Sequence, residues 1–312
     1  MSWPDLSLSL SGLELATPLI AASGVWPLSP GLWPRESLAG LGAVCSKGLT
    51  LKPRQGNPGV RLWETPSGLL NSIGLQNPGL EHFLDQDLPQ MAQAGLPLIL
   101  NLAPESREEI ERMLDLLNRR ADRIGAVELN LSCPNVSRGG MAWGISAQGV
   151  ARATSLARAV WQGKLWIKLT PQAPDIGAAA RAAEKAGGDA VVVANTWLGM
   201  AMDLDRARPA FERVTAGLSG PAIFPLTLRL VWEAAQEVEI PVVASGGVSS
   251  WEEAGAMILA GASAVEVGTG LLKDLELPTK ICQGLDRYIK KLNFKSVSEL
   301  KGKGRENAEA QD

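Results

Sequence analysis

The stretch PVVASGGVSSWEEAGAMILAGASAVEVGTG, residues 241–270, contains one complete strand–helix–strand unit of a parallel sheet. Its first apolar run ends in Ser245-Gly246-Gly247, and its second ends in Gly268-Thr269-Gly270. Between them, Ser250 and Glu253 have the spacing of a capping box, which predicts that a helix begins there. The first of these runs, Pro241–Ala244, is continuous rather than alternating, a pattern typical of strands in a sheet that is buried on both faces.

The same order of apolar run and amphipathic segment recurs along the chain. Amphipathic helices are predicted at Ser106–Asp122 and Pro225–Val238, where apolar residues recur at helical spacing. Ser106 and Glu109 have the spacing of a second capping box at the start of the first of these helices. Eight strands with intervening helices indicate an α/β fold, a (β/α)8 TIM barrel. A doubly wound sheet is the alternative, but no GxGxxG motif follows the first strand. The predicted strands are Leu19–Ala22, Ala43–Ser46, Pro97–Leu102, Ala126–Leu131, Leu165–Leu169, Ala190–Ala194, Pro241–Ala244 and Ala264–Val267.

Two segments are expected to be additions to the barrel. Residues 5–15 are expected to form an N-terminal hairpin across the bottom of the barrel. The segment Thr50–Thr65 is too long and too rich in proline and glycine for a plain loop, and it predicts a protruding insertion after strand 2. Residues 1–294 are thus expected to form a single barrel domain, and the polar residues 295–312 a loosely ordered tail.

The composition excludes several classes of protein. The 312 residues include 30 Lys and Arg and 33 Asp and Glu, which gives a formal net charge of −3, and 46% of them are hydrophobic. A disordered chain would have fewer hydrophobic residues and a larger net charge. A nucleic-acid-binding protein would have a clustered excess of basic residues. The longest uncharged stretch, Leu15–Pro34, holds four prolines and is no membrane helix. We therefore expect neither nucleic acid nor a membrane as a partner.

The three cysteines, Cys45, Cys133 and Cys282, form no CxxC pair. This excludes a zinc ribbon and a cysteine-ligated iron–sulfur cluster built from this chain alone, and no metal site is expected. An odd number of cysteines leaves at least one free thiol, and the N-terminus has no basic signal-peptide region. These features predict a protein of the reducing cytoplasm.

A polar residue or a glycine follows every predicted strand. The C-terminal ends of the strands carry the chemistry of a TIM barrel, so these residues predict a polar pocket over the barrel mouth. Glycines after strands seven and eight leave backbone N–H groups open to an anion, which favours a phosphate-bearing cofactor over a pair of tight turns. The strand ends are Ser23-Gly24, Ser46-Lys47, Asn101, Asn130, Lys168, Asn195-Thr196, Ser245-Gly246-Gly247 and Gly268-Thr269-Gly270.

Two lysines and one cysteine at these ends are candidates for chemistry. A buried Lys168 needs an anionic partner, which a reduced flavin would supply, unless its side chain reaches solvent. Lys47 likewise needs an anionic partner if it is buried, and a carboxylate or a phosphate would suit it. Cys133, in a glycine-rich loop after the fourth strand, is a candidate base or nucleophile, the alternative being a buried structural thiol. Cys45 and Cys282 are expected to be structural.

Several longer motifs resemble those of class 1 dihydroorotate dehydrogenases. The resemblance extends from about Ser7 to Tyr288 and is closest to the NAD-linked class 1B catalytic subunit. Two positions depart from the family pattern, with Pro104 close after Asn101 and Trp143 in place of a phenylalanine. The motifs are Lys47-Gly-Leu-Thr-Leu-Lys-Pro-Arg-Gln-Gly-Asn-Pro58, Trp63-Glu-Thr-Pro66, Asn71-Ser-Ile-Gly-Leu-Gln-Asn-Pro-Gly79, Glu128-Leu-Asn-Leu-Ser-Cys-Pro-Asn-Val136, Asn195-Thr-Trp-Leu-Gly-Met200 and Leu218-Ser-Gly-Pro-Ala222.

The resemblance implies FMN-dependent oxidation of (S)-dihydroorotate to orotate in de novo pyrimidine (UMP) biosynthesis. Cys133 is then the general base that removes the C5 proton while a hydride passes from C6 to N5 of FMN. Residues implied to bind FMN are Ser23, Lys47, Gly48, Asn101, Asn130, Lys168, Ala194, Gly220, Gly246, Gly247, Gly268 and Thr269. Residues implied to bind the substrate are Lys47, Asn71, Ser72, Ile73, Gly74, Leu75, Asn130, Asn195 and Thr196.

The resemblance also implies a partner. In class 1B a homodimer of barrels assembles with a second flavoprotein subunit, which carries FAD and a 2Fe–2S cluster and passes electrons to NAD⁺. The result is a heterotetramer. This chain has no CxxC pair and no dinucleotide-binding fingerprint. Both observations agree with the binding of FAD and the 2Fe–2S cluster by another subunit.

Four alternatives remain open at this point. The first two are a class 1A enzyme that reduces fumarate without a partner and another dihydropyrimidine-type flavin oxidoreductase. A third, a tRNA-modifying flavin barrel, would need a basic surface, against which the net charge of −3 counts. The fourth is a catalytically silent scaffold, which the set of Asn130, Cys133 and Lys168 makes less favourable.

Overall fold

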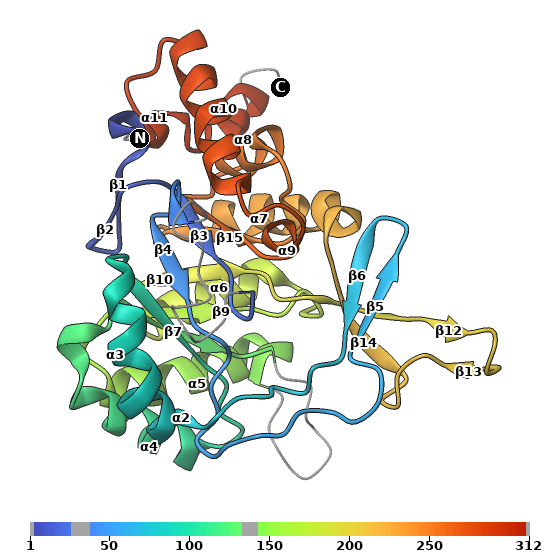
Figure 1. Cartoon of the computed structure of the whole chain (residues 1–312). Coiled ribbons are helices and arrows are strands. Elements are labelled where there is room, and N and C mark those ends of the chain that lie inside the picture. The colour runs from blue at the N-terminus through green and yellow to red at the C-terminus, as the bar shows by residue number, and fades with distance from the viewer. Residues whose placement is uncertain (1–2, 26–37, 133–142, 310–312) are drawn as a thin grey trace.

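The computed structural model describes residues 3–25, 38–132 and 143–309, and its centre is a closed barrel of eight parallel strands (Figure 1). Each strand pairs with the next one along the chain, and the last pairs with the first. The predicted TIM barrel is confirmed, and each strand lies where an apolar run predicts it. The strands are β3 (Leu19–Ala21), β4 (Ala43–Cys45), β7 (Leu98–Leu102), β8 (Ala126–Asn130), β9 (Leu165–Lys168), β10 (Ala190–Val193), β15 (Val242–Ser245) and β16 (Ala264–Val267).

Helices cover the outside of the barrel (Figure 1). Both predicted N-caps form: the N–H of Glu109 donates to Oγ of Ser106 at 3.2 Å, and that of Glu253 to Oγ of Ser250 at 3.3 Å. The two glutamate side chains accept from the N–H of the residue before each N-cap, Glu105 and Ser249. None of the helices in the described ranges is long and apolar enough to cross a membrane. The longer helices are α4 (Arg107–Asn118), α5 (Ala147–Val160), α6 (Ile176–Lys185), α7 (Phe224–Glu237), α8 (Trp251–Leu259) and α10 (Leu277–Lys291).

Shorter helical turns complete the connections. Between β4 and β7 a series of them replaces one continuous helix, and η3 is a π-helical turn. The short elements are η1 (Pro4–Leu6), α2 (Leu80–His82), η3 (Phe83–Asp87), α3 (Leu88–Met91), η4 (Ala92–Ala94), η5 (Ala121–Arg123), η6 (Trp143–Ile145), η7 (Pro221–Ile223) and α9 (Thr269–Lys273).

The N-terminal hairpin covers the bottom of the barrel, as predicted. Strands β1 (Leu8–Leu10) and β2 (Leu13–Leu15) pair in antiparallel fashion. Leu10 and Leu15 are buried in one cluster with interior side chains of the barrel, among them Trp166. This apolar contact closes the N-terminal end, so the polar groups of the interior lie toward the C-terminal ends of the strands.

A second sheet projects from the barrel (Figure 1, right). It contains β5 (Leu62–Thr65), β6 (Gly68–Asn71), β14 (Thr215–Ser219) and β11 (Trp197–Met200), with β14 between β6 and β11. A short ribbon of β12 (Met202–Asp203) and β13 (Arg208–Pro209) lies beyond it. The predicted insertion after strand 2 is present, although its hairpin extends beyond Thr65. The sequence pattern did not predict the insertion after β10, because its strand β14 pairs with residues up to 150 positions away.

The C-terminal segment differs from the expected loosely ordered tail. It forms α11 (Val297–Leu300) and α12 (Lys303–Glu309). Val297 and Leu300 are buried, and the N–H of Gly302 donates to the carbonyl of Ile258 in α8 at 3.0 Å. Burial of these two apolar side chains packs an otherwise polar segment against the helices of the barrel.

Candidate active site

Polar side chains form a layer in the barrel interior above the apolar layer at its bottom. Alternate residues of a strand point to the same side, so residues two apart, such as Trp166 and Lys168, both face the interior. Trp166 belongs to the apolar layer, and Lys168 to the polar one. Every residue of the polar layer is buried, with at most 4% exposure. The layer consists of Cys45, Asn101, Glu128, Lys168 and Glu266.

Lys168 is paired with two carboxyl groups instead of reaching solvent. Its Nζ atom lies 2.6 Å from Oε2 of Glu266 and 3.3 Å from Oε1 of Glu128. Although burial acts to lower the pKa of Lys168, the two carboxyl groups raise it above its usual value. The anionic partners that a buried Lys168 needs are therefore present in the chain itself. An ammonium has three N–H donors, so one is left for a group bound in the mouth.

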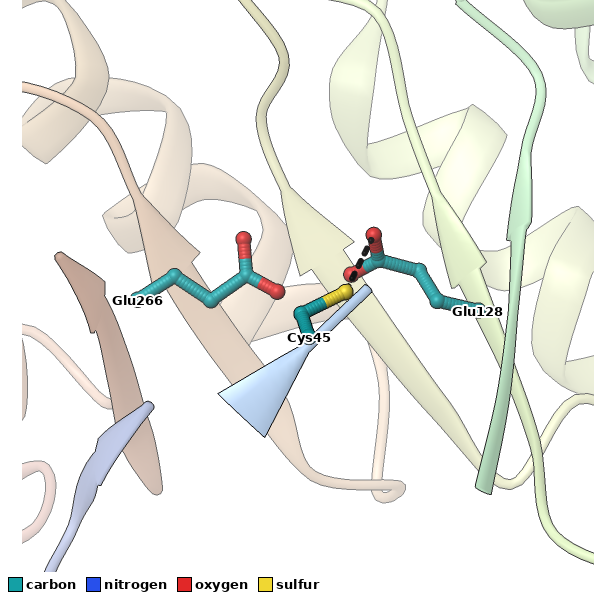
Figure 2. A group of neighbouring side chains, drawn as sticks. All are labelled: Cys45, Glu128 and Glu266. Atoms are coloured by element: carbon teal, nitrogen blue, oxygen red, sulfur yellow. Dashed lines mark hydrogen bonds between the residues drawn. The ribbon is translucent and has the colours of Figure 1, made fainter. Parts of the chain in front are cut away.

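Cys45, Glu128 and Glu266 point into one space inside the barrel (Figure 2). The Sγ atom of Cys45 lies 3.5 Å from Oε1 of Glu128, and Nδ2 of Asn101 donates to the same oxygen. One thiol or carboxyl atom from each of the three residues lies within 4.8 Å of the others, a spacing that could suit a metal ion. However, the ammonium of Lys168 already brings a positive charge against both carboxyl groups. We therefore interpret this cluster as the binding site of the Lys168 cation.

The two glutamates differ in their affinity for a proton. Burial, followed by the charge of Glu266, raises the pKa of Glu128 to about 8. Burial acts to raise the pKa of Glu266 as well, but the charge of Lys168 brings it below its usual value. Burial and the neighbouring carboxyl groups raise the pKa of Cys45, which is therefore a thiol at neutral pH.

Above this cluster, amide side chains form a row across the barrel mouth. Nδ2 of Asn130 lies 3.4 Å from Oδ1 of Asn101, and Nδ2 of Asn195 lies 3.2 Å from Oδ1 of Asn130. The N–H of Thr196 donates to Oδ1 of Asn195 at 2.7 Å. The fold thus brings together four predicted site residues from three strand ends. An amide offers both donors and acceptors, so the row suits a ring with N–H and C=O groups.

Lys47 supplies a second cation at the mouth. A methyl group at Gly24 would lie 3.2 Å from Nζ of Lys47, which places Lys47 beside the loop after β3. Burial lowers the pKa of Lys47, and no carboxylate acts on it among the residues that the structure describes. An anion bound here would compensate that charge. The next residue, Gly48, is close to two other predicted site residues, because a methyl group there would lie 3.1 Å from Asn101 and 3.2 Å from Leu75.

The loop that contains residues 71–75 reaches the amide row from the projecting sheet. Nδ2 of Asn71 donates to the carbonyl of Gly217 at 3.1 Å, and a methyl group at Gly217 would collide with the hydroxyl of Thr196. Asn71 and Thr196 therefore flank the same glycine. The hydroxyl of Ser72 accepts a hydrogen bond of 2.9 Å from Asn57. The structure therefore brings Asn71 to the mouth and engages the side chain of Ser72 within the loop.

Three glycine-containing segments lie near one another beside the ends of the last two strands of the barrel. They contain Gly247, Gly220 and Gly268. Gly247 has a φ of +88°, and a methyl group there would lie 2.5 Å from Cα of Phe224, at the start of α7. The hydroxyl of Thr269 donates to that of Ser219 at 2.8 Å, which places the end of β16 beside Gly220. Backbone that approaches this closely without side chains is what a phosphate cradle requires.

The remaining predicted residues follow the strand ends or lie in the loop before Leu75. Ser23 is half-buried after β3, and the N–H of buried Ala194 donates to the carbonyl of Ser245 at 3.0 Å. Ile73 and Gly74 are half-buried within the loop before Leu75. Gly246 follows β15, and Gly268 follows β16.

Cys133 lies outside the described residues. The chain leads to it from an anchored strand end: the N–H of Ser132 donates to Oδ1 of Asn130, and that of Leu131 to the carbonyl of Lys168, each at 3.1 Å. Trp143, where the described chain resumes, is buried.

Sequence reasoning overlooked the two interior glutamates. Glu128 and Glu266 each stand inside an apolar run, two positions before the strand ends at Asn130 and Gly268. Because strands alternate with a period of two, a residue at that spacing faces the same way as the strand-end residue. A single charged residue two positions before the end of an otherwise apolar strand is therefore the sequence signal that could have identified Glu128 and Glu266.

Comparisons with known proteins agree with this geometry. The family described as "Dihydroorotate dehydrogenase" matches residues 5–289. Curated relatives named "Dihydroorotate dehydrogenase B (NAD(+)), catalytic subunit" include one from Bacteroides thetaiotaomicron, 40% identical over 96% of this chain and 98% of its own length. The relative from Thermoanaerobacter pseudethanolicus is 41% identical over the same shares. That from Geotalea daltonii is 39% identical over 97% of this chain and 99% of its own.

Among solved structures, the fold is similar to that of DHODH from Eimeria tenella in complex with ferulenol. The TM-score is 0.79, at 20% sequence identity, over 97% of this chain and 89% of that chain. At this identity the likeness supports the barrel fold alone.

Proposed function

This chain belongs to the dihydroorotate dehydrogenase family, and we propose that it is the catalytic subunit of an NAD⁺-linked enzyme that oxidises (S)-dihydroorotate to orotate in pyrimidine biosynthesis. The observation that carries the proposal is the identity of 40% over 96% of the chain to a catalytic subunit of that name. The row of Asn101, Asn130 and Asn195 supports the same substrate class, because a pyrimidine ring presents both N–H donors and C=O acceptors.

The family implies a flavin, and we propose that the flavin is FMN. Two observations support the fit: the convergent glycine backbone beside Ser219 and Thr269 suits a phosphate, and Lys168 retains one N–H donor for the ring. The residues proposed to surround the ring are Ser23, Lys47, Gly48, Asn101, Asn130, Lys168 and Ala194. Those proposed around the ribityl phosphate are Gly220, Gly246, Gly247, Gly268 and Thr269.

The substrate is proposed to lie between the amide row and the loop that contains residues 71–75. Lys47 is a buried cation without a carboxylate partner in the described part of the chain, so it suits the carboxylate of dihydroorotate. Residues proposed to contact the substrate are Lys47, Asn71, Ser72, Ile73, Gly74, Leu75, Asn130, Asn195 and Thr196.

In the proposed reaction, Cys133 removes the proton from C5 of dihydroorotate. When bound, FMN supplies the acceptor for the hydride that leaves C6. A thiol acts as a base only in its ionised form, and ionisation of a thiol increases toward alkaline pH. Asn130 and Asn195 orient the ring, while Lys168 keeps a positive charge at the mouth.

The printed name of the relatives, "catalytic subunit", indicates that their enzymes contain a further subunit. We propose a cytoplasmic heterotetramer in which two barrels form a homodimer and partner subunits with FAD and a 2Fe–2S cluster pass electrons to NAD⁺. The three cysteines without a CxxC pair support a cluster on another chain. Exposed apolar side chains of the inserted segment support a protein contact, since Leu198 on β11 is 60% exposed and Leu204, in the turn after β12, is 87% exposed.

An anaerobic visible spectrum of the purified chain, taken before and after addition of dihydroorotate, tests the proposal. We expect flavin absorption that bleaches on addition. Flavin that stays oxidised both alone and with a partner subunit would refute the substrate. Turnover with fumarate by the chain alone would favour a class 1A enzyme over the NAD⁺-linked one.

A further inference from the structure

In the described part of the chain, the polar layer contains two carboxyl groups and one cation. Glu128 and Glu266 are completely buried or nearly so, and Lys168 is the cation paired with both among the described residues. If both carboxyl groups were ionised, the cluster with Cys45 as a thiol would carry one uncompensated negative charge. A buried charge without compensation is costly, and a buried site of this kind takes up a proton instead.

The hydrogen bonds point to the same missing proton. Oε1 of Glu128 accepts from Asn101, Lys168 and Cys45, and Oε2 of Glu266 accepts from Lys168. The second oxygens, Oε2 of Glu128 and Oε1 of Glu266, are buried and accept no hydrogen bond from any residue that the structure describes. Two facing carboxylates offer acceptors only, whereas a carboxylic acid adds one donor. A proton on one of the two carboxyl groups therefore supplies a hydrogen-bond donor beside Oε2 of Glu128 and Oε1 of Glu266, two oxygens that accept no bond from the described residues.

We propose that Glu128 and Glu266 share one proton and one negative charge, and that they act as positioning residues that hold Lys168 protonated beneath the barrel mouth. The part of this proposal that concerns the flavin rests on the proposed function. The part that concerns the proton depends only on the residues of this chain.

The proton resides mainly on Glu128. The ammonium of Lys168 is nearer to Glu266, at 2.6 Å, than to Glu128, at 3.3 Å, so the negative charge is more favourable on Glu266. The pKa values agree in direction, since that of Glu128 is raised by burial and that of Glu266 is lowered by Lys168 against the effect of its burial. Cys45 keeps its own proton because burial and the two carboxyl groups raise its pKa.

One carboxylate is then sufficient to balance Lys168. In Glu128→Gln, the amide replaces a neutral acid of nearly the same shape, and Glu266 keeps the negative charge. In Glu266→Gln, Glu128 loses its proton and takes over that charge. In the double variant no carboxylate remains, and a buried ammonium without a counter-charge loses its proton.

The first experiment is infrared spectroscopy of the purified chain at neutral pH, which requires no flavin. We expect a carbonyl stretch of a buried, protonated carboxylic acid in the wild type and its loss in both Glu128→Gln and Glu266→Gln. The exposed residue Glu81 on α2 provides the control, and Glu81→Gln should retain the band. A wild type without the band, or a band that survives in both interior variants, would overturn the shared proton.

The second experiment measures the flavin midpoint potential in the two single variants and in the double variant. We expect each single variant to alter the preference for reduced over oxidised flavin by less than about threefold. The double variant should lower that preference at least tenfold, which is about 30 mV for a two-electron couple. If the shifts in midpoint potential of the two single variants added up to the shift of the double variant, both carboxyl groups would be ionised in the wild type. A raised preference in the double variant would mean that Lys168 stays charged without them.

The two experiments separate the proposal from the proposed function. A protein that shows the infrared band but is not reduced by dihydroorotate would retain the shared proton and refute the substrate. A protein that is reduced by dihydroorotate but lacks the band would retain the function and refute the shared proton.

Discussion

The Nζ atom of Lys168 donates a hydrogen bond of 2.6 Å to Oε2 of Glu266, which lies 98 residues further along the chain. Their strands, β9 and β16, are not neighbours in the barrel, so the bond crosses the interior. The ammonium also lies 3.3 Å from Oε1 of Glu128, the oxygen to which Asn101 of the amide row donates. The cation proposed for the active site is therefore held by carboxyl groups of the barrel interior, and several measurable consequences depend on this arrangement.

Replacement of Lys168 should affect both the cofactor and the fold. In Lys168→Ala we expect weaker retention of FMN and a lower flavin potential, because the reduced, anionic flavin loses its counter-charge. Removal of one partner of a buried pair typically costs about 3–5 kcal/mol of stability, part of which proton uptake by Glu266 would offset. Potentiometry and chemical denaturation measure the two effects. Lys185→Ala, at an exposed position on α6, is the control, and an unchanged potential in Lys168→Ala would remove Lys168 from the flavin.

Glu128 should make stability depend on pH. Its pKa is raised by burial from 4.5 to about 8 in the folded state, so the folded chain holds a proton that the unfolded chain releases. That contribution is complete below pH 4.5 and disappears as pH rises through about 8, with a slope of at most about 1.4 kcal/mol per pH unit. Denaturation curves at several pH values should show a decline between these limits in the wild type that is smaller in Glu128→Gln. Equal slopes in the two proteins would contradict the raised pKa.

Lys47 should bind the carboxylate of the substrate. Its pKa is lowered by burial, so an anion that restores a counter-charge gains a strong interaction. In Lys47→Ala we expect orotate to bind at least about tenfold more weakly, as for the loss of a hydrogen bond to a charged group. Titration of the flavin spectrum with orotate measures this affinity. Lys52→Ala, at an exposed position in the same loop, should leave it unchanged, and an unaltered affinity in Lys47→Ala would exclude the contact.

Cys133 should control the rate of flavin reduction but not the retention of flavin. Loss of a general base typically lowers a rate by about 10²–10⁴-fold, so Cys133→Ser should reduce its flavin at least 100-fold more slowly with FMN still bound. Stopped-flow reduction by dihydroorotate measures the rate, which in the wild type should rise toward alkaline pH. Cys282→Ala, on α10, is the matched control. Equal rates in Cys133→Ser and the wild type would refute the assignment of the base.

Gly247 should be needed for the phosphate cradle. Gly247 and Gly95 both have positive φ, of +88° and +72°, but a methyl group at Gly247 would meet Phe224 whereas one at Gly95 would have open space around it. Both Gly247→Ala and Gly95→Ala therefore place an alanine at a positive φ, which strains the backbone. Only Gly247→Ala also brings the new methyl group against Phe224. We expect FMN to be lost from Gly247→Ala during gel filtration and retained by Gly95→Ala. Similar FMN content in the two variants would indicate that the backbone at Gly247 does not hold the phosphate.

Local patterns predicted much of the fold because they reflect local physics. Apolar runs between amphipathic segments predicted all eight barrel strands, and two capping boxes predicted where α4 and α8 begin. The same reasoning failed for the projecting sheet, since β6 pairs with β14 and no local pattern records such a partner. The buried residues Val297 and Leu300 likewise gave too weak a local signal to predict that the tail would pack.

The sequence by itself determined the eight-stranded barrel, the polar strand ends and the resemblance that led to a flavin and a pyrimidine. Spacing along the chain is enough for these, because strand alternation, helix capping and motifs act over a few residues. Only the tertiary structure decided which charges face one another inside the barrel. Lys168 was the predicted cation, but Glu128 and Glu266 become its partners only when closure of the barrel turns alternate side chains of distant strands into one buried space. Electrostatic interactions are stronger there than at the protein surface.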